Sequence, residues 1–149
     1  MTNLHGTCVA FGAVGVLLRG APGAGKSTLA LQLMDTPGLG LGRKMLVARL
    51  VADDQVLLHK RGRSVMAAPP PVLAGLMEIR GLGLVRVSHR KSAAIRLVVD
   101  LVAPEEVPRL PEAESMRVEL LGLALPRLVV AQRLAAAPAI IRAALARLI

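Results

Sequence analysis

Residues 20–27 match the pattern G-x-x-x-x-G-K-[S/T] without a gap. The apolar run Gly15–Arg19 before them predicts a strand, and Lys26–Met34 after them carries apolar positions at helical spacing. Strand, glycine-rich turn and helix in this order are typical of loops that bind phosphate. Glycines let backbone N–H groups turn inward, and the amino end of the helix adds a favourable dipole. This phosphate loop consists of Gly20, Ala21, Pro22, Gly23, Ala24, Gly25, Lys26 and Ser27.

Two side chains of the phosphate loop suit a nucleotide that carries a metal ion. Lys26 offers a movable cation to the β and γ phosphates, and the Ser27 hydroxyl can ligate magnesium. The motif therefore predicts binding of ATP and Mg²⁺ for phosphoryl transfer, and it leaves the acceptor open. The alternative is a glycine-rich turn without a ligand, which the flanking strand and helix disfavour.

Two consecutive aspartates, Asp53 and Asp54, follow the apolar run Met45–Ala52, which predicts a strand that delivers them to one edge of a sheet. Nucleotide-dependent kinases need a carboxylate there to hold magnesium, and a second carboxylate could be the base for an acceptor hydroxyl. Consecutive strand residues point to opposite faces, so we do not expect the two to share one role. The sequence leaves open which of them is the base, and a plain strand-ending turn is the alternative.

The rest of the chain predicts a strand-rich α/β protein with few helices. Residues 138–148 carry an apolar stripe that predicts a final helix. The prolines Pro69 to Pro71 predict an extended segment, and the proline-containing Ala103–Ser115 predicts a loop. Further strands are predicted at Thr7–Phe11, Val56–His59, Arg63–Met66, Leu84–Val87, Ile95–Val102 and Val118–Leu125. With 149 residues and no linker, we expect one domain, residues 1–149, built on a mixed sheet.

The composition narrows the choice of partners. The formal net charge is +9, spread along the chain, which fits either a solvated basic surface or attraction for phosphates or an acidic partner protein. Phe11 is the only aromatic residue, so bases have nothing to stack on. We therefore expect no nucleic acid as partner.

The amino-terminal stretch and the single cysteine bear on the location of the protein. Cys8 is alone, which excludes an intrachain disulfide, and with no secretory signal this predicts a cytoplasmic protein with Cys8 in its core. Met1–Leu18 has no formally charged residue, but it lacks a basic flank and contains His5 and Thr7. We expect buried strands there and no membrane segment.

Four segments together resemble the catalytic domain of HPr kinase/phosphorylase. They are His5-Gly6, the phosphate loop, Leu50–Asp54 and the EIRGLG segment formed by Glu78, Ile79, Arg80, Gly81, Leu82 and Gly83. The EIRGLG segment is the most diagnostic, although by itself it indicates only a turn of the chain. Asp100–Val102 followed by Arg109-Leu110 resembles a further motif, and the resemblance runs from His5 to about Leu125.

The resemblance implies a fold related to the nucleotide-binding part of phosphoenolpyruvate carboxykinase. It implies an ATP- and Mg²⁺-dependent kinase that phosphorylates a serine of the phosphocarrier protein HPr and can reverse the reaction. Lys26 would contact the transferring phosphate, and Ser27 and Glu78 would serve magnesium. Asp53 or Asp54 would be the base, His5 and Arg109 match further active-site positions, and residues 78–83 would lie near the docked HPr. The resemblance also implies a homo-oligomer.

The sequence departs from the family pattern at several places. Thr28 stands where the family has an acidic residue, and the stretch Pro37–Arg43 lengthens the connection to Asp53. Pro126-Arg127 replaces a Pro-Gly-Arg-Asn segment tied to dephosphorylation, and we expect a short form without the family's amino-terminal domain. Two alternatives remain: a small-molecule kinase or NTPase, which leaves EIRGLG unexplained, and a non-catalytic nucleotide-binding regulator.

Overall fold

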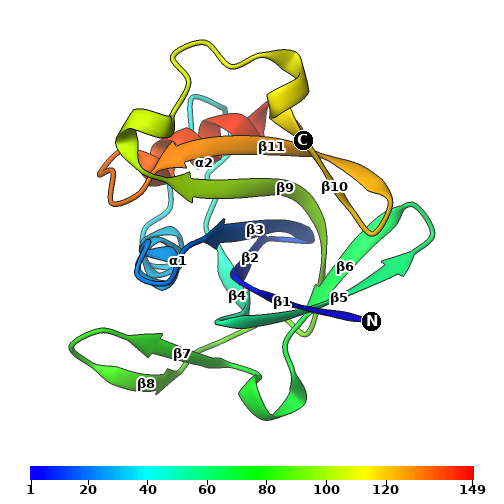
Figure 1. Ribbon diagram of the computed structural model, residues 1–149. Coiled ribbons are helices and arrows are strands. Elements are labelled where there is room, and N and C mark those ends of the chain that lie inside the picture. Colours follow the sequence, from blue (N-terminus) through cyan, green and yellow to red (C-terminus); the bar gives the residue numbers. More distant parts are fainter.

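The computed structural model describes residues 1–149, which form a nine-stranded sheet, a separate two-stranded sheet and two α-helices (Figure 1). The strands of the large sheet are β1 (Thr2–His5), β2 (Thr7–Phe11), β3 (Val14–Gly20), β4 (Arg49–Ala52), β5 (Gln55–Arg61), β6 (Ser64–Ala68), β9 (Ala93–Val102), β10 (Arg117–Leu120) and β11 (Leu123–Ala131). The small sheet pairs β7 (Leu76–Ile79) with β8 (Gly83–Arg86). The helices are α1 (Lys26–Asp35) and α2 (Ala137–Ala146), with short 3-10 helices η1 (Pro71–Leu73), η2 (Pro104–Glu106) and η3 (Ala113–Met116).

The large sheet is mixed, as the sequence predicts. Its strand order is β1-β5-β6-β9-β3-β2-β4, and β11 pairs with both β9 and β10. Strand β9 is parallel to β3 and to β11, whereas the other pairs are antiparallel. The carboxyl ends of β3, β9 and β11 therefore meet at one edge, where the phosphate loop leaves β3 and the chain turns from β11 into α2.

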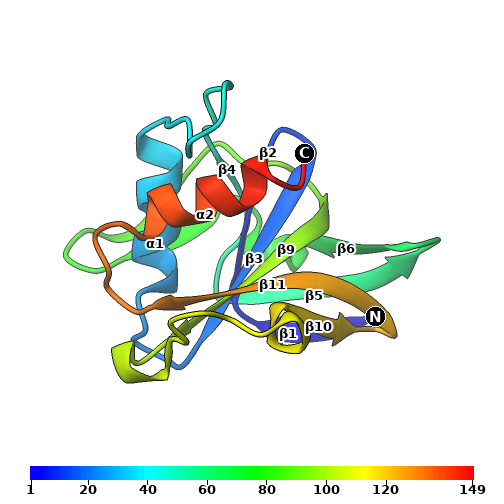
Figure 2. The ribbon, with the colours of Figure 1, turned by 90° about the horizontal axis from the view of Figure 1, so that it is seen from above.

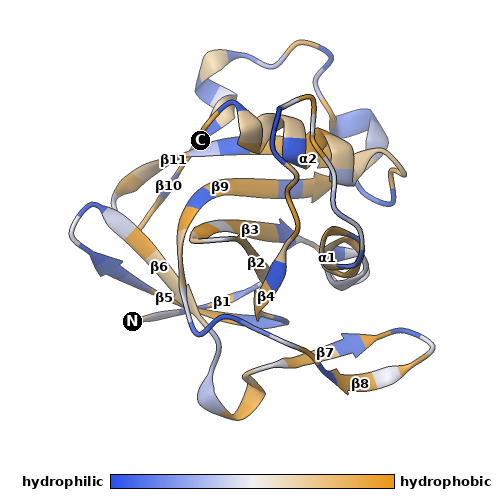
Figure 3. Ribbon diagram, turned by 180° about the vertical axis from the view of Figure 1, so that it is seen from behind, coloured by the Kyte–Doolittle hydropathy of each residue, from blue (hydrophilic) through white to orange (hydrophobic).

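Both faces of the central strands are buried, which explains their nearly continuous apolar sequence. Val16 and Leu18 of β3 face the cluster that includes both helices, whereas Leu17 between them faces the second cluster. Both helices lie on the same side of β3, β9 and β11 (Figure 2). The central strands are largely hydrophobic along their length (Figure 3). The buried Cys8 belongs to the second cluster, and burial raises the pKa of its thiol to about 12.

Several sequence predictions need correction. The interval predicted as one strand at Val118–Leu125 is a hairpin, because Leu121 and Gly122 both have positive φ (51° and 80°) and form a two-residue turn. The prolines do not end in an extended segment, since Pro71 begins η1, where its missing N–H costs nothing. The EIRGLG segment is not all loop: its ends belong to β7 and β8. Strand β1 lies in the stretch Met1–Leu18, where buried strands are expected, but most of its residues are exposed. Only the end of Met45–Ala52 is a strand.

The lengthened stretch after α1 is explained by a buried arginine on α2. Arg142 is 4% exposed and donates to the carbonyls of Leu46 (3.0 Å), Leu33 (3.2 Å) and Thr36. Leu33 and Thr36 lie at the carboxyl end of α1, where the helix dipole favours a cation, and Leu46 lies in the connection after the helix. The chain passes so close over Arg142 that a Cβ at Gly40 would collide with its backbone. The glycines of Pro37–Arg43 thus allow this close crossing.

Asp100 on β9 joins three neighbouring parallel strands. Its carboxylate accepts from Arg19 on β3 (2.8 and 2.9 Å) and from Arg127 on β11 (2.6 Å). Burial by itself would raise the pKa of Asp100, but the two arginines outweigh it and lower the pKa below its ordinary value.

No helix of the chain is both long and apolar enough to cross a membrane.

We expect Asp100→Asn to lower the free energy of unfolding at pH 7 by about 1–3 kcal/mol, because the arginines lose a charged acceptor. A lowered pKa gives stability that is complete above the ordinary carboxyl pKa and is lost as pH falls below it. The difference between variant and wild type should therefore shrink from pH 7 to pH 3 in urea denaturation. An exposed control, Glu105→Gln, should change little; a constant difference across pH would contradict the role of the Asp100 charge.

Candidate functional site

The phosphate loop connects β3 directly to α1. Gly25 has φ 94°, a left-handed conformation that glycine adopts without strain, and it caps the amino end of the helix. Lys26 is the first helical residue, and its Nζ donates to the carbonyls of Gly20 (2.9 Å) and Ala21 (3.1 Å). Burial lowers the pKa of Lys26, while the charges of Asp53 and Asp54 act in the opposite direction. A cation is thus held inside the loop next to two carboxylates.

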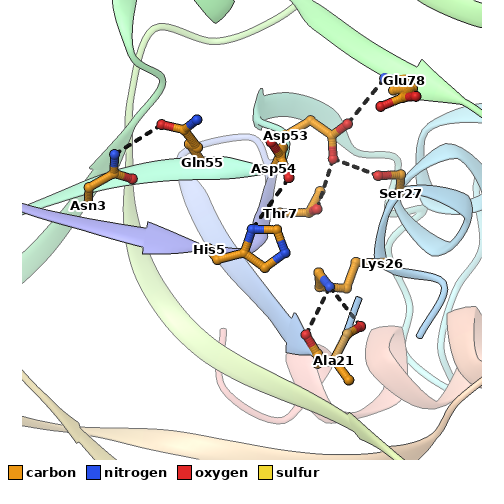
Figure 4. Close-up of polar contacts among 11 residues, drawn as sticks. Asn3, His5, Thr7, Ala21, Lys26, Ser27, Asp53, Asp54, Gln55 and Glu78 are labelled. Atoms are coloured by element: carbon orange, nitrogen blue, oxygen red, sulfur yellow. Dashed lines mark hydrogen bonds and ion pairs between the residues drawn. The ribbon is translucent and has the colours of Figure 1, made fainter. Parts of the chain in front are cut away.

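Asp53 lies beside Ser27, the last residue of the phosphate loop (Figure 4). It is 6% exposed, and its Oδ1 accepts from the hydroxyls of Ser27 (2.7 Å) and Thr7 (2.9 Å). Its Oδ2 accepts from the backbone N–H of Glu78 (3.3 Å). One carboxylate therefore links β2, the start of α1 and β7.

The side chain of Asp54 is exposed and lies next to His5 rather than next to Ser27 (Figure 4). Strand β4 ends at Ala52, and Asp54 has φ 68°, so the alternation of a strand does not continue through the pair. The Asp54 carboxylate lies 3.4 Å from Nδ1 of His5, and both side chains are more than half exposed. The prediction that the two aspartates differ in role is consistent with these two environments.

The EIRGLG segment forms a hairpin that lies apart from the large sheet, on the far side of α1 from the β11–α2 loop (Figure 1). The hairpin is attached through Met77, which is fully buried in the cluster with both helices. Glu78, Ile79, Arg80, Gly81 and Gly83 line the cleft next to the phosphate loop. Leu82 does not line the cleft and is 69% exposed at the hairpin tip.

A cleft of about 940 Å³ runs past the phosphate loop. On one side it is lined by His5, Thr7, Asp54, Glu78 and Arg80, which are polar, and by Ile79, Gly81 and Gly83 of the hairpin. On the other side it is lined mainly by small or apolar residues, namely Leu101, Ala131, Leu134, Ala135 and Ala137, together with Arg133. The cleft thus has a polar end and a largely apolar end, with Lys26 and Ser27 between them.

The structure does not bring every predicted site residue to this cleft. Arg109 is exposed in the loop after η2 and is not among the residues that line it. Its place in the site stays a prediction. Sequence reasoning missed two residues: Thr7, a β2 residue whose neighbour Asp53 is distant in sequence, and Arg133, which is one of many arginines and belongs to no motif.

The donor set near the phosphate loop fits Mg²⁺ that is shared with a nucleotide. Ser27 and Asp53 present oxygen atoms 2.7 Å apart, and Glu78 carries a carboxylate on the adjoining strand. Mg²⁺ binds through oxygen and takes one or two carboxylates plus substrate phosphates rather than a full protein cage. The chain has no group of three or more His, Cys, Asp or Glu side chains that could hold a metal ion.

Comparison with known proteins assigns the chain to a family. The family described as HPr Serine kinase C-terminal domain matches residues 1–148. The chain belongs to this family. The expected resemblance to HPr kinase/phosphorylase is therefore confirmed.

Individual relatives support the same assignment. The chain is 37% identical over 138 residues to the HPr kinase/phosphorylase of Burkholderia lata, an alignment that covers 86% of the chain and 39% of that relative. It is 35% identical over 107 residues to the HPr kinase/phosphorylase of Lacticaseibacillus casei, covering 66% of the chain and 30% of that relative. The aligned part is thus well under half of each relative's length.

The fold also matches a solved structure, the Hpr(Ser) kinase/phosphatase from Coxiella burnetii. The TM-score is 0.79 at 23% identity, and the match covers 99% of this chain and 90% of that chain. At this identity the match supports the α/β mixed-sheet fold.

We expect Thr7→Val to lower the free energy of unfolding by about 1–2 kcal/mol, because it removes a buried hydroxyl that donates to Asp53 and keeps the side-chain shape. Chemical denaturation measures the change. The matched control is Thr2→Val on the exposed strand β1, which should be nearly neutral. Equal stability of the two variants would show that the Thr7–Asp53 bond contributes nothing.

Proposed function

We propose that this chain is an ATP- and Mg²⁺-dependent kinase that phosphorylates a serine of the phosphocarrier protein HPr. One observation carries the proposal: the phosphate loop, Asp54 and the EIRGLG hairpin border one cleft. Asp53 connects the phosphate loop to the hairpin through Ser27 and the backbone of Glu78. The family and the curated names of its relatives support HPr as the protein substrate.

The two ends of the cleft suit the two halves of a phosphoryl transfer. The apolar end at Leu101, Leu134 and Ala135 suits the nucleoside of the donor. The polar end at Asp54 and Arg80 suits a serine hydroxyl carried in by a protein. The phosphate loop lies between these ends, so a phosphate chain held by its N–H groups would point from donor to acceptor. This arrangement favours in-line transfer.

The residues of the loop have separate tasks in the proposal. Lys26 exchanges its contacts with Gly20 and Ala21 for the phosphates and neutralises their charge. Ser27 and Asp53, with Glu78, hold Mg²⁺, which when bound balances negative charge on the phosphates. The hairpin positions HPr through Arg80 and the exposed Leu82.

One of the two aspartates supplies the base that accepts the serine proton. Asp54 lines the cleft beside His5, whereas Asp53 is buried and its Oδ1 accepts from the hydroxyls of Ser27 and Thr7. In the reverse direction the same carboxyl would act as the acid.

We further propose, from the family resemblance, a phosphoenolpyruvate carboxykinase-like nucleotide site, cytoplasmic location and homo-oligomeric assembly.

The first test is transfer of labelled phosphate from ATP with Mg²⁺ to purified HPr. Wild-type HPr should be labelled, and HPr with its acceptor serine replaced should not, because the proposal assigns the serine as the only acceptor. Incubating labelled HPr with inorganic phosphate and no ATP tests the phosphorylase direction, in which the phosphoryl group passes to phosphate, pyrophosphate is formed and the serine hydroxyl is restored. If ATP binds and HPr stays unlabelled, the chain is a kinase for another acceptor or a nucleotide-binding regulator.

Arg80→Ala separates docking of HPr from chemistry. We expect labelling of HPr to fall roughly tenfold while ATP affinity stays unchanged, because a central contact residue of an interface contributes this much and lies outside the phosphate loop. The control is Arg86→Ala, at the other end of strand β8 and away from the cleft. Equal labelling by the two variants would remove Arg80 from the docking surface.

Asp53→Asn and Asp54→Asn distinguish the carboxylate that binds Mg²⁺ from the one that accepts the serine proton. We expect only Asp53→Asn to raise the Mg²⁺ concentration needed for half-maximal labelling, because Asp53 adjoins Ser27. At saturating Mg²⁺, the aspartate that is the base should still show a loss of about 10²–10⁴-fold in kcat, since added metal cannot replace it. Full activity of both variants at saturating Mg²⁺ would overturn the carboxylate part of the mechanism.

A further inference from the structure

The loop between β11 and α2 forms the wall of the cleft opposite the EIRGLG hairpin. It carries Arg133, Leu134 and Ala135, all of which line the cleft. No motif in the sequence singles out this segment, and the proposed function assigns no charged group to it. Arg133 is its only charged residue, because the other residues from 131 to 137 are alanine, glutamine and leucine.

Arg133 reaches the phosphate loop directly. Its Nη2 donates to the carbonyl of Gly23 at 2.6 Å. Its Cγ lies 4.0 Å from the position that a Cβ on Gly25 would take, so the side chain extends over two glycines of the loop. Arg133 is exposed and has no carboxylate partner, since the ion pairs of the chain are His5–Asp54 and the two at Asp100.

The backbone of Arg133 is held in an unusual conformation. Its φ is 59°, in the left-handed region that non-glycine residues rarely adopt. Such a conformation persists only where the surroundings fix it, and it is most frequent at ligand-binding sites. Here β11 ends at Ala131, and the turn at Arg133 directs its side chain back over the phosphate loop.

Arg133 and Lys26 contact the phosphate loop in the same way, although they come from different parts of the chain. Each cation rests on carbonyl oxygens of the phosphate loop: Lys26 on Gly20 and Ala21, and Arg133 on Gly23. Neutral carbonyls are weaker partners for a guanidinium than phosphate oxygens, which accept from it in a charge-assisted and often bidentate way. A phosphate chain in the loop would therefore draw Arg133 from Gly23.

We propose that Arg133 is a second phosphate-binding cation of this site, which closes over the di- or triphosphate chain of the nucleotide from the β11–α2 side. This inference rests on the proposed nucleotide site. It adds a second cation to Lys26 of the phosphate loop. This arginine comes from a loop that is 110 residues from Gly23 in the sequence.

Arg133→Gln is the decisive variant, because glutamine keeps a polar side chain with N–H donors but removes the positive charge. Calorimetric titration with Mg²⁺ and either ATP or inorganic pyrophosphate measures phosphate affinity. We expect both affinities to fall roughly ten- to a hundredfold, as for loss of a hydrogen bond to a charged group. Arg133→Lys should recover part of the loss because it retains the charge.

The matched control is Arg63→Gln in the exposed β5–β6 turn, which removes the same charge far from the loop. Equal affinities of Arg133→Gln and Arg63→Gln would overturn the inference. A fall in ATP affinity without a fall in pyrophosphate affinity would also overturn it, because the contact would then not be to phosphate. The melting temperature of the ligand-free variants should stay close to wild type; a large drop in Arg133→Gln alone would indicate a purely structural role.

The outcome is separable from that of the proposed function. If the wild type binds neither ATP nor pyrophosphate, the proposed nucleotide site fails and this inference fails with it. If the wild type binds both and Arg133→Gln binds them equally well, only the role of Arg133 fails. If HPr is not phosphorylated but Arg133→Gln weakens both ligands, the role of Arg133 stands and the proposed acceptor is wrong.

Discussion

The carboxylate of Asp53 is the contact on which the arrangement of the cleft depends. Through Thr7, Ser27 and the backbone of Glu78 it joins β2, the phosphate loop and the hairpin, three segments that are far apart in sequence. A buried carboxylate must have its hydrogen bonds satisfied, so these donors cannot move independently of one another. The loop that would hold phosphates and the hairpin that would meet a partner are therefore placed by the same group.

The positive charges of the chain fall into groups with different partners. Arg19 and Arg127 are paired with Asp100, so they hold parallel strands together. Arg142 is buried and satisfied by carbonyls alone, which ties α2 to the end of α1. Lys26 and Arg133 also rest on carbonyls, but at a solvent-open cleft. The high net charge therefore does not come from a single basic surface. Some arginines have structural partners, and the cations that line the cleft are those that a ligand can reach.

Local patterns made much of this fold predictable. The phosphate loop, α1, β2, β9 and the position of the aspartates after a strand follow from spacing and turn chemistry within short windows. The family was recognisable because EIRGLG accompanies the loop, and the match over residues 1–148 confirms it. What the sequence could not reveal is non-local. Thr7 and Asp53 are 46 residues apart, and Arg133 and Gly23 are 110 apart. The Leu121–Gly122 turn was missed because leucine rarely adopts positive φ.

Cys8 has a practical consequence for work on this molecule. Its thiol is fully buried, and with a pKa of about 12 it carries almost no thiolate at neutral pH, the form that reacts with electrophiles. It is also the only cysteine of the chain. A cysteine introduced at the hairpin tip, for example in place of the exposed Leu82, would be the single reactive thiol of the native protein. Spin labels or fluorophores could then follow the hairpin against the body of the protein without first removing the native cysteine.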